Sequence, residues 1–217
     1  EASGEMYGAQ LIEALRTGGA TGVPARPATP IDFFGAGGER MRAAGCDIVV
    51  DAKDLAVVGI TEIVSHLPKI LGLYKKLIRA TDQRRPALAV VIDSPAFNWR
   101  VARQMRRRGI PVVYYVCPQF WAWRQGRVKL LRKYVNKALV IFPFEEKFYR
   151  DRGVDATFVG HPLADVVASK YTCEEARIQL GLARDRRTVA LIPGSRNKEI
   201  MNLLPDMLRA ARIIRER

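Results

Sequence analysis

The chain has 217 residues, 48% of them hydrophobic, so it can bury one complete core and part of a second. Its three cysteines are far apart and it has only two histidines, which argues against a disulfide framework or a zinc site and fits a reducing cytoplasm. No apolar run approaches the ~20 residues of a membrane-spanning helix, and no signal peptide opens the chain. We therefore expect a soluble or peripheral protein.

The net charge of +14 is concentrated in one part of the chain. Between Asp93 and Glu145 there is no acidic residue, whereas eleven residues are basic: Arg100, Arg103, Arg106, Arg107, Arg108, Arg124, Arg127, Lys129, Arg132, Lys133 and Lys137. We expect one strongly basic face that attracts polyanions. Nucleic acid, anionic lipid and phosphorylated substrates all fit, and charge alone does not choose among them.

The first residues read as a small-residue loop, 1–5, that leads into a helix through Leu11, Ile12 and Leu15 and ends at residues 18–19. Such a loop suits an anion or substrate, and a chain that starts there suggests that an N-terminal strand is missing. Residues 31–34 are predicted to form a short strand. Residues 35–38 resemble half of a dinucleotide fingerprint, but the third glycine is missing, so a tight turn into a helix is the favoured interpretation.

Residues 60–78 predict an amphipathic helix, kinked or restarted at Pro68. Two interpretations remain open. The helix could simply pack on the sheet. Alternatively, with its apolar flank at residues 55–60, it could expose a surface for acyl chains or lipid, each buried side chain contributing roughly 1.5–3 kcal/mol.

A run of five apolar residues, 88–92, stops abruptly at Asp93. Without alternation it predicts a strand buried on both faces of a parallel sheet, and ligands gather at the carboxyl ends of such strands. Asp93 is then either a catalytic carboxylate or the cap of the following helix.

After Asp93 we expect helices at 98–108, 125–135 and 145–151, alternating with strands at 111–116, 138–142 and 157–160. This alternation predicts an α/β fold with a doubly wound parallel sheet. The loop 118–124 places Trp121, Trp123 and Arg124 just past a strand, as in a pocket wall. His161 ends another strand without nearby Asp, Ser or Cys partners, so a structural histidine is its alternative.

Beyond this sheet, Thr172 to Glu175 form a capping box that opens a helix closed by Gly181. Residues 188–192 are predicted to be a buried strand that leads into a loop with Gly194, Ser195 and Arg196, which suits a diphosphate, and then into a helix. We therefore expect one domain at 1–168, and at 169–217 a linker with the start of a second, truncated α/β domain.

Six stretches in this order, 1–5, 35–41, 92–98, 118–124, 160–162 and 193–196, resemble the lipid-A-disaccharide synthase family of bacterial glycosyltransferases. The resemblance implies a GT-B fold, in which two Rossmann-like domains with parallel sheets flanked by helices face a cleft, and no cofactor or metal. It implies transfer from UDP-2,3-diacylglucosamine to 2,3-diacylglucosamine 1-phosphate (lipid X), with inversion of the anomeric centre and release of UDP.

Carried onto this chain, the resemblance makes Asp93 the general base for the acceptor 6-hydroxyl, and Arg196, with Gly194 and Ser195, the binding site for the UDP diphosphate. It implies substrate contacts from Glu1, Ser3, Asn98, Trp121, Trp123, Arg124 and His161. It also implies an acyl and membrane surface on the cytoplasmic side of the anionic inner membrane, formed by Val57, Ile63, Val64, Leu67, Ile70 and Leu71.

Glu5 stands where the family usually has Asp, and without most of a second domain we expect the chain alone to be inactive. Two other functions agree less well with the sequence. A nucleic-acid-binding domain is disfavoured because no such motif appears and the aromatic residues cluster at one strand end. Another GT-B enzyme with a water-soluble acceptor is disfavoured by the apolar helix. The oligomeric state and the residue that binds the 1-phosphate remain open.

Overall fold

The structure is a computed structural model that describes residues 2–17, 31–56, 63–164, 167, 170–195 and 197–216. Its helices are α1 (Ala2–Thr17), α2 (Glu39–Ala43), α3 (Ala52–Ala56), α4 (Ile63–Arg84), α5 (Pro95–Arg107), the 3-10 helix η1 (Gln125–Arg127), α6 (Val128–Tyr134), α7 (Pro143–Arg150), α8 (Cys173–Gln179) and α9 (Asn197–Arg215). Its strands are β1 (Phe33–Gly37), β2 (Cys46–Asp51), β3 (Ala89–Ile92), β4 (Val112–Tyr115), β5 (Lys137–Val140) and β6 (Ala156–Phe158).

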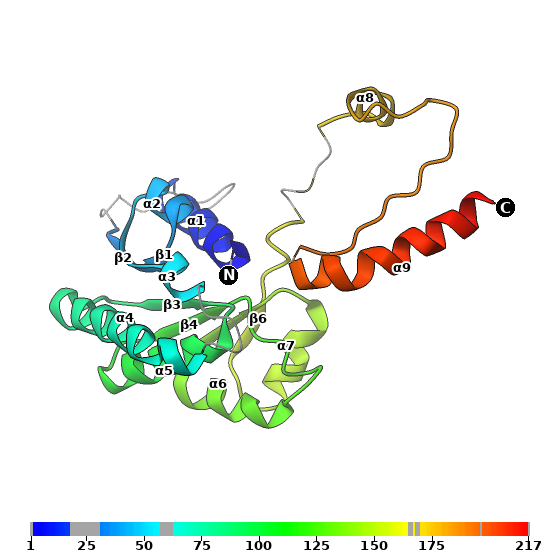
Figure 1. Cartoon of the computed structure of the whole chain (residues 1–217). Coiled ribbons are helices and arrows are strands. Elements are labelled where there is room, and N and C mark those ends of the chain that lie inside the picture. Colours follow the sequence, from blue (N-terminus) through cyan, green and yellow to red (C-terminus); the bar gives the residue numbers. More distant parts are fainter. Residues whose placement is uncertain are drawn as a thin grey trace. The chain divides into compact units, whose positions relative to one another are not determined.

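The described strands form two parallel sheets, one with the order β1-β2 and one with the order β3-β4-β5-β6. In the larger sheet Val91 lies opposite Tyr114, and Tyr114 lies opposite Ala138. Figure 1 shows α5 and α6 on one side of this sheet and α1 on the other. The predicted α/β class, with parallel strands flanked by helices, is confirmed.

The main core lies between the four-stranded sheet and helices α5 and α6. Val112, Tyr114, Ala138, Val140 and Ala156 contribute from the strands and are almost fully buried. Apolar residues of α5 recur at positions 101, 102 and 105, so one stripe of this helix faces the sheet. The solvent-facing surface of α5 carries arginines, and they form part of the basic face described below.

Strand β3 is less buried than the sequence predicts. Val90 is 38% exposed and Leu88, just before the strand, is 49% exposed, so the prediction of burial on both faces is wrong. The reason is position, because among the strands that the structure describes β3 lies at the edge of its sheet and pairs with β4 alone.

The first strand also differs from its prediction. β1 covers Phe33–Gly37, so Gly35 and Gly37 belong to the strand and not to the turn. A Cβ on Gly37 would lie 2.5 Å from the sulfur of Met41, which explains the glycine as space for a neighbouring side chain. Strand β2 was not predicted, and α4 runs through Pro68 without a restart.

By its internal contacts the chain divides into two units, Glu1–Val166 and Val167–Arg217. In the second unit the capping box is confirmed, because the Glu175 N–H donates to Thr172 Oγ1 at 3.3 Å and the Thr172 N–H donates to Glu175 Oε2 at 2.8 Å. The division falls two residues before the predicted domain boundary, which stays a prediction.

The buried strand predicted at 188–192 is wrong. These residues form no strand, and Val189 and Ile192 are 61% and 79% exposed. A strand needs a neighbour for its backbone N–H and C=O groups, and the described residues of the second unit contain no other strand. No helix in the described ranges is long and apolar enough to cross a membrane.

Candidate active site at the carboxyl edge of the sheet

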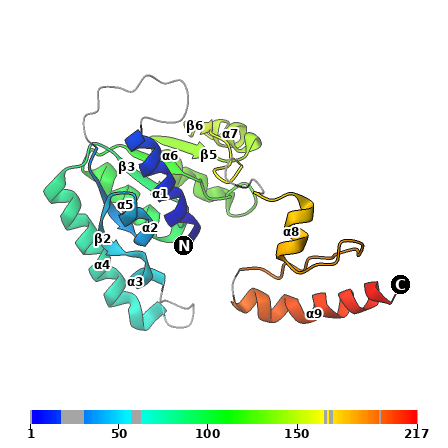
Figure 2. The same ribbon diagram turned by 90° about the horizontal axis from the view of Figure 1, so that it is seen from above.

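The ends of three parallel strands meet α1 at one edge of the sheet. Tyr7 of α1 packs with Val116, which follows β4, and with Ile141, which follows β5. Ile92, the last residue of β3, and Leu163 flank this cluster. Asp93 follows Ile92 directly, so its carboxylate belongs to the edge where ligands of parallel sheets bind. Figure 2 shows α1 across the sheet from above.

The backbone of Asp93 has an unusual conformation that is held by three hydrogen bonds. Asp93 and Ser94 have φ values of +49° and +26°, a region that costs a residue with a side chain about 1–2 kcal/mol. The Asp93 N–H donates to the Tyr115 carbonyl at 3.2 Å. Its carbonyl accepts from Asn98 Nδ2 at 2.9 Å and from the Tyr114 hydroxyl at 2.5 Å. Ser94, and not Asp93, occupies the N-cap position of α5, and its side chain makes no capping hydrogen bond. The alternative interpretation of Asp93 as the helix cap is therefore wrong.

Two tyrosines near Asp93 stay protonated. Burial raises the pKa of Tyr7, and the negative charge of Asp93 raises it further. Burial also raises the pKa of Tyr114 far above its ordinary value. Both phenols are therefore hydrogen-bond donors throughout the physiological range.

The loop after β4 is anchored by a buried carboxylate. Trp121 Nε1 donates to Glu145 Oε1 at 2.7 Å, and Glu145 is 0% exposed. Its other oxygen accepts from the N–H groups of Ile141 and Phe142 at 3.2 and 3.1 Å. Sequence reasoning missed Glu145, although its place in the first turn of a helix, three residues after the N-cap, is typical of a capping acid.

The two other predicted residues of this loop reach solvent. Trp123 is 57% exposed, and the Arg124 guanidinium carbon lies 4.6 Å from its ring centroid. Because the indole N–H of Trp121 is already bonded to Glu145, the solvent-exposed pair of Trp123 and Arg124, which lie against each other, are the members of the loop that can meet a ligand.

His161 joins an aromatic row at the same edge. Its ring centroid lies 6.1 Å from that of Phe142, which stacks on Phe144 at 5.7 Å, and Phe144 meets Trp121 edge-on at 4.9 Å. His161 Nδ1 accepts the N–H of Leu163 at 3.1 Å. The neutral imidazole then carries its proton on Nε2, which makes that nitrogen a donor.

The glycine-rich segment 35–38 and the start of α2 contact Glu5 of α1. Glu5 Oε1 accepts the N–H of Arg40 at 2.9 Å, and a Cβ on Gly38 would lie 2.6 Å from that oxygen. Gly38 therefore makes room for the Glu5 carboxylate at the start of α2. It is the residue of 35–38 that forms the turn into this helix, because residues 35–37 belong to β1. Ser3 is half-buried in the first turn of α1, and Glu1 lies outside the described residues.

The predicted acyl surface is only partly described. Leu77 and Ala80 of α4 are buried and Tyr74 packs against the main core, so the C-terminal half of this helix packs on the core of the fold. Towards its N-terminal half Ile70 is half-buried and Leu71 is 46% exposed. Val57 and the side chains of Ile63, Val64 and Leu67 lie outside the described part of the chain.

In the second unit a side chain of the following helix, Glu199 of α9, occupies the predicted diphosphate loop. The Ser195 N–H donates to Glu199 Oε2 at 3.1 Å, and a Cβ on Gly194 would lie 2.6 Å from the same oxygen. A diphosphate at this loop would have to displace the Glu199 carboxylate. Arg196 lies outside the described residues.

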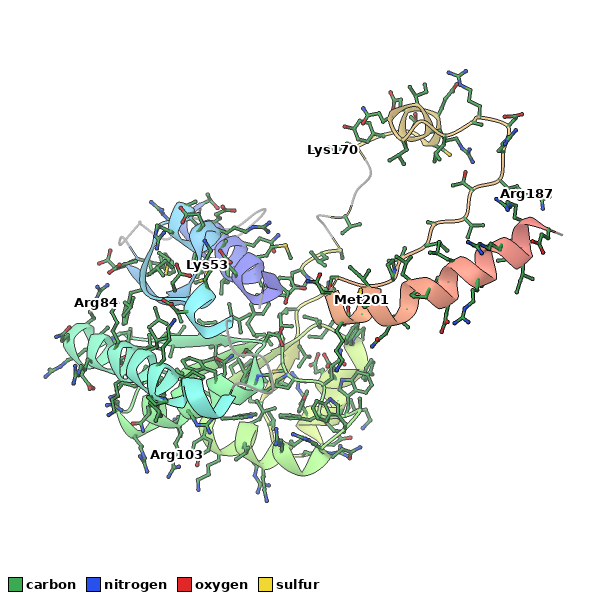
Figure 3. The ribbon with its side chains drawn as sticks, in the orientation of Figure 1. Lys53, Arg84, Arg103, Lys170, Arg187 and Met201 are labelled. Carbon is green, nitrogen blue, oxygen red and sulfur yellow. The ribbon has the colours of Figure 1, made fainter. Side chains whose placement is uncertain are left out.

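The basic face lies on α5 and α6. Its exposed cations are Arg100, Arg103, Arg106, Arg107, Lys129, Arg132 and Lys133. Figure 3 shows Arg103 projecting from α5 away from the sheet. A hollow of about 480 Å³ opens on α6. A second hollow, of about 690 Å³, lies at the amino ends of β3 and β4, between Thr81 and Pro111. Neither hollow is lined by Asp93 or by the Trp121 loop.

Comparison with known proteins gives consistent matches over the whole chain. Residues 1–217 match the model of the lipid-A-disaccharide synthetase family. The chain is 52% identical over 212 residues to the lipid-A-disaccharide synthase of Koribacter versatilis, covering 98% of the chain and 53% of that relative. It is 46% identical over 217 residues to that of Solibacter usitatus, covering 100% and 55%, and 45% identical over 212 residues to that of Myxococcus xanthus, covering 98% and 53%. The chain thus spans about half the length of these curated relatives.

Proposed function

The chain belongs to the lipid-A-disaccharide synthetase family, and we propose that it forms the acceptor-side half of an inverting glycosyltransferase of GT-B type. The reaction joins UDP-2,3-diacylglucosamine to 2,3-diacylglucosamine 1-phosphate and releases UDP and the lipid A disaccharide 1-phosphate. The proposal is supported by the family match over residues 1–217 and by an α/β fold with a carboxylate at the carboxyl edge of its sheet.

Asp93 is the general base of this reaction. Its carboxylate takes the proton of the acceptor 6-hydroxyl while that oxygen attacks the anomeric carbon of the donor, and the bond to the UDP oxygen breaks. The single observation that carries this role is the place of Asp93, directly after a parallel strand and beside the start of α1, where an acceptor can reach both.

Side chains from the loops after β4 and β6, at the same edge of the sheet as Asp93, hold the acceptor. His161 Nε2 and the exposed guanidinium of Arg124 are donors for its hydroxyl and phosphate oxygens, and Trp123 offers an open ring to the sugar face. The diphosphate of the donor goes to Gly194, Ser195 and Arg196. Glu199 leaves its place at Ser195 when the donor binds.

The enzyme works at the cytoplasmic surface of the inner membrane. The apolar N-terminal half of α4, with Leu71 half exposed, takes up acyl chains together with Val57, Ile63, Val64, Leu67 and Ile70. The basic face on α5 and α6 favours anionic headgroups, each nearby cation adding about 1 kcal/mol.

The test uses the chain extended by the remaining half of the K. versatilis relative. Formation of disaccharide and release of UDP from the two diacylated substrates are followed together. The Asp93→Asn variant should lose turnover while both substrates still bind, because the amide keeps the shape and cannot take a proton. Substantial turnover by that variant would remove Asp93 from the role of base, and no disaccharide from the unmodified protein would refute the reaction itself.

A further inference from the structure

Two side chains from different elements bind the same backbone carbonyl, that of Asp93. Asn98 Nδ2 lies 2.9 Å from this oxygen and the Tyr114 hydroxyl lies 2.5 Å from it. We propose that Tyr114 and Asn98 are positioning residues that hold the carboxylate of Asp93 in its reactive orientation. This inference rests on the proposed role of Asp93 as general base.

The conformation at Asp93 needs such support. Two consecutive residues with side chains, Asp93 and Ser94, have positive φ values of +49° and +26°. Left alone, the chain would relax to negative φ, because the left-handed region crowds Cβ against the backbone. A rotation about φ would swing the Cα–Cβ bond of Asp93 and carry the carboxylate away from the strand ends.

Asn98 is well placed to oppose that rotation. It lies in the first turn of α5, is 9% exposed, and its amide nitrogen donates to the carbonyls of both Ile92 and Asp93, at 2.9 Å each. The two hydrogens of the amide are then both used on backbone. The side chain thus clamps the end of β3 to the helix, and we assign it this role in place of the substrate contact that the family resemblance implied.

Tyr114 supplies the second clamp from the neighbouring strand. Its side chain is fully buried, its ring packs on that of Trp99 with centroids 5.8 Å apart, and burial keeps its hydroxyl protonated. Because the Asp93 N–H is also bonded, to the Tyr115 carbonyl at 3.2 Å, both backbone polar groups of Asp93 are fixed. Only rotation of its own side chain is left, which is the condition for a preorganised base.

The test compares Tyr114→Phe with a matched control in the extended protein. Tyr114→Phe removes one hydroxyl and keeps the ring. We expect kcat to fall about tenfold to a hundredfold with KM for both substrates within about twofold, since misplacing a reacting group by about 1 Å costs up to a hundredfold. The control is Tyr74→Phe, which removes a hydroxyl that donates to the Arg100 carbonyl of α5 at 3.2 Å and not to the backbone of Asp93, and it should change neither constant.

Circular dichroism shows whether each variant is folded. If Tyr114→Phe is not folded, Asn98→Ser is measured in its place and should give the same fall in kcat at constant KM. Wild-type kcat in the folded variant, or an equal fall in Tyr74→Phe, overturns the positioning role. Asp93→Asn runs in parallel: if it is inactive while Tyr114→Phe is fully active, only the positioning role fails, and if it is active, the proposed base fails with it.

Discussion

The hydrogen bond between Trp121 and Glu145 is predicted to stabilise the whole edge of the sheet. Glu145 accepts three N–H groups, from Trp121, Ile141 and Phe142, and is 0% exposed. In Glu145→Gln one amide oxygen can still accept the two backbone N–H groups. The amide NH₂ must then face the indole N–H of Trp121, so one bond is lost and two donors oppose each other.

A hydrogen bond to a charged group contributes about 1.5–3 kcal/mol, and a buried donor left without an acceptor costs a similar amount. We therefore expect Glu145→Gln to lower the free energy of unfolding by about 2–3 kcal/mol. For a unit of this size, each kcal/mol lowers Tm by about 2–4 °C.

The assay is urea unfolding of the chain followed by circular dichroism, with Trp121→Phe and the double variant completing a cycle. Because both single changes remove the same bond, the cost of the double variant should fall short of their sum by about 1–2 kcal/mol. Loss of less than about 0.5 kcal/mol in Glu145→Gln, or strict additivity, would refute the reasoning.

Three further predictions concern other parts of the chain. Gly38→Ala should destabilise by about 1–3 kcal/mol in thermal unfolding, since its methyl group would meet the Glu5 carboxylate, and Glu5→Asp should relieve most of that loss. Hydrogen bonds from the backbone and side chain of Thr172 lower the pKa of Glu175. The carboxylate therefore stabilises α8 fully above the ordinary glutamate pKa of about 4.3, and this stabilisation is lost as pH falls through the lowered pKa. Amide exchange across α8 should show this loss, and the Glu175→Gln variant should not show it. Leu71→Ser should weaken binding of the extended protein to anionic vesicles without lowering Tm, whereas lost stability with unchanged binding would make Leu71 a packing residue.

Local sequence patterns correctly predicted many of the helices and strands. The alternation of helices and strands between Asp93 and residue 160 is confirmed because each element is amphipathic or apolar by itself, and residues such as Gly109, Pro111 and Gly153 mark several of the boundaries. The capping box at Thr172 is confirmed for the same reason, since all its atoms lie within one helical turn.

Predictions that depended on a neighbour were wrong. Leu88 and Val90 were expected to be buried, but no residue pattern shows that a strand will lie at the edge of a sheet. Residues 188–192 have the composition of a buried strand and remain exposed, because a strand exists only with a partner.

The candidate site also divides into features that follow from local sequence and features that depend on neighbouring elements. The sequence alone determined that a carboxylate, Asp93, follows an apolar strand, that an aromatic loop follows the next strand, and which family these stretches resemble. Only the tertiary structure decided that the carbonyl of Asp93 is clamped by Asn98 and Tyr114, and that Trp121 is bound to a buried Glu145 while Trp123 stays open. These contacts join residues up to 24 positions apart, and their distances depend on how strands pair and helices pack, which no local pattern of side chains specifies.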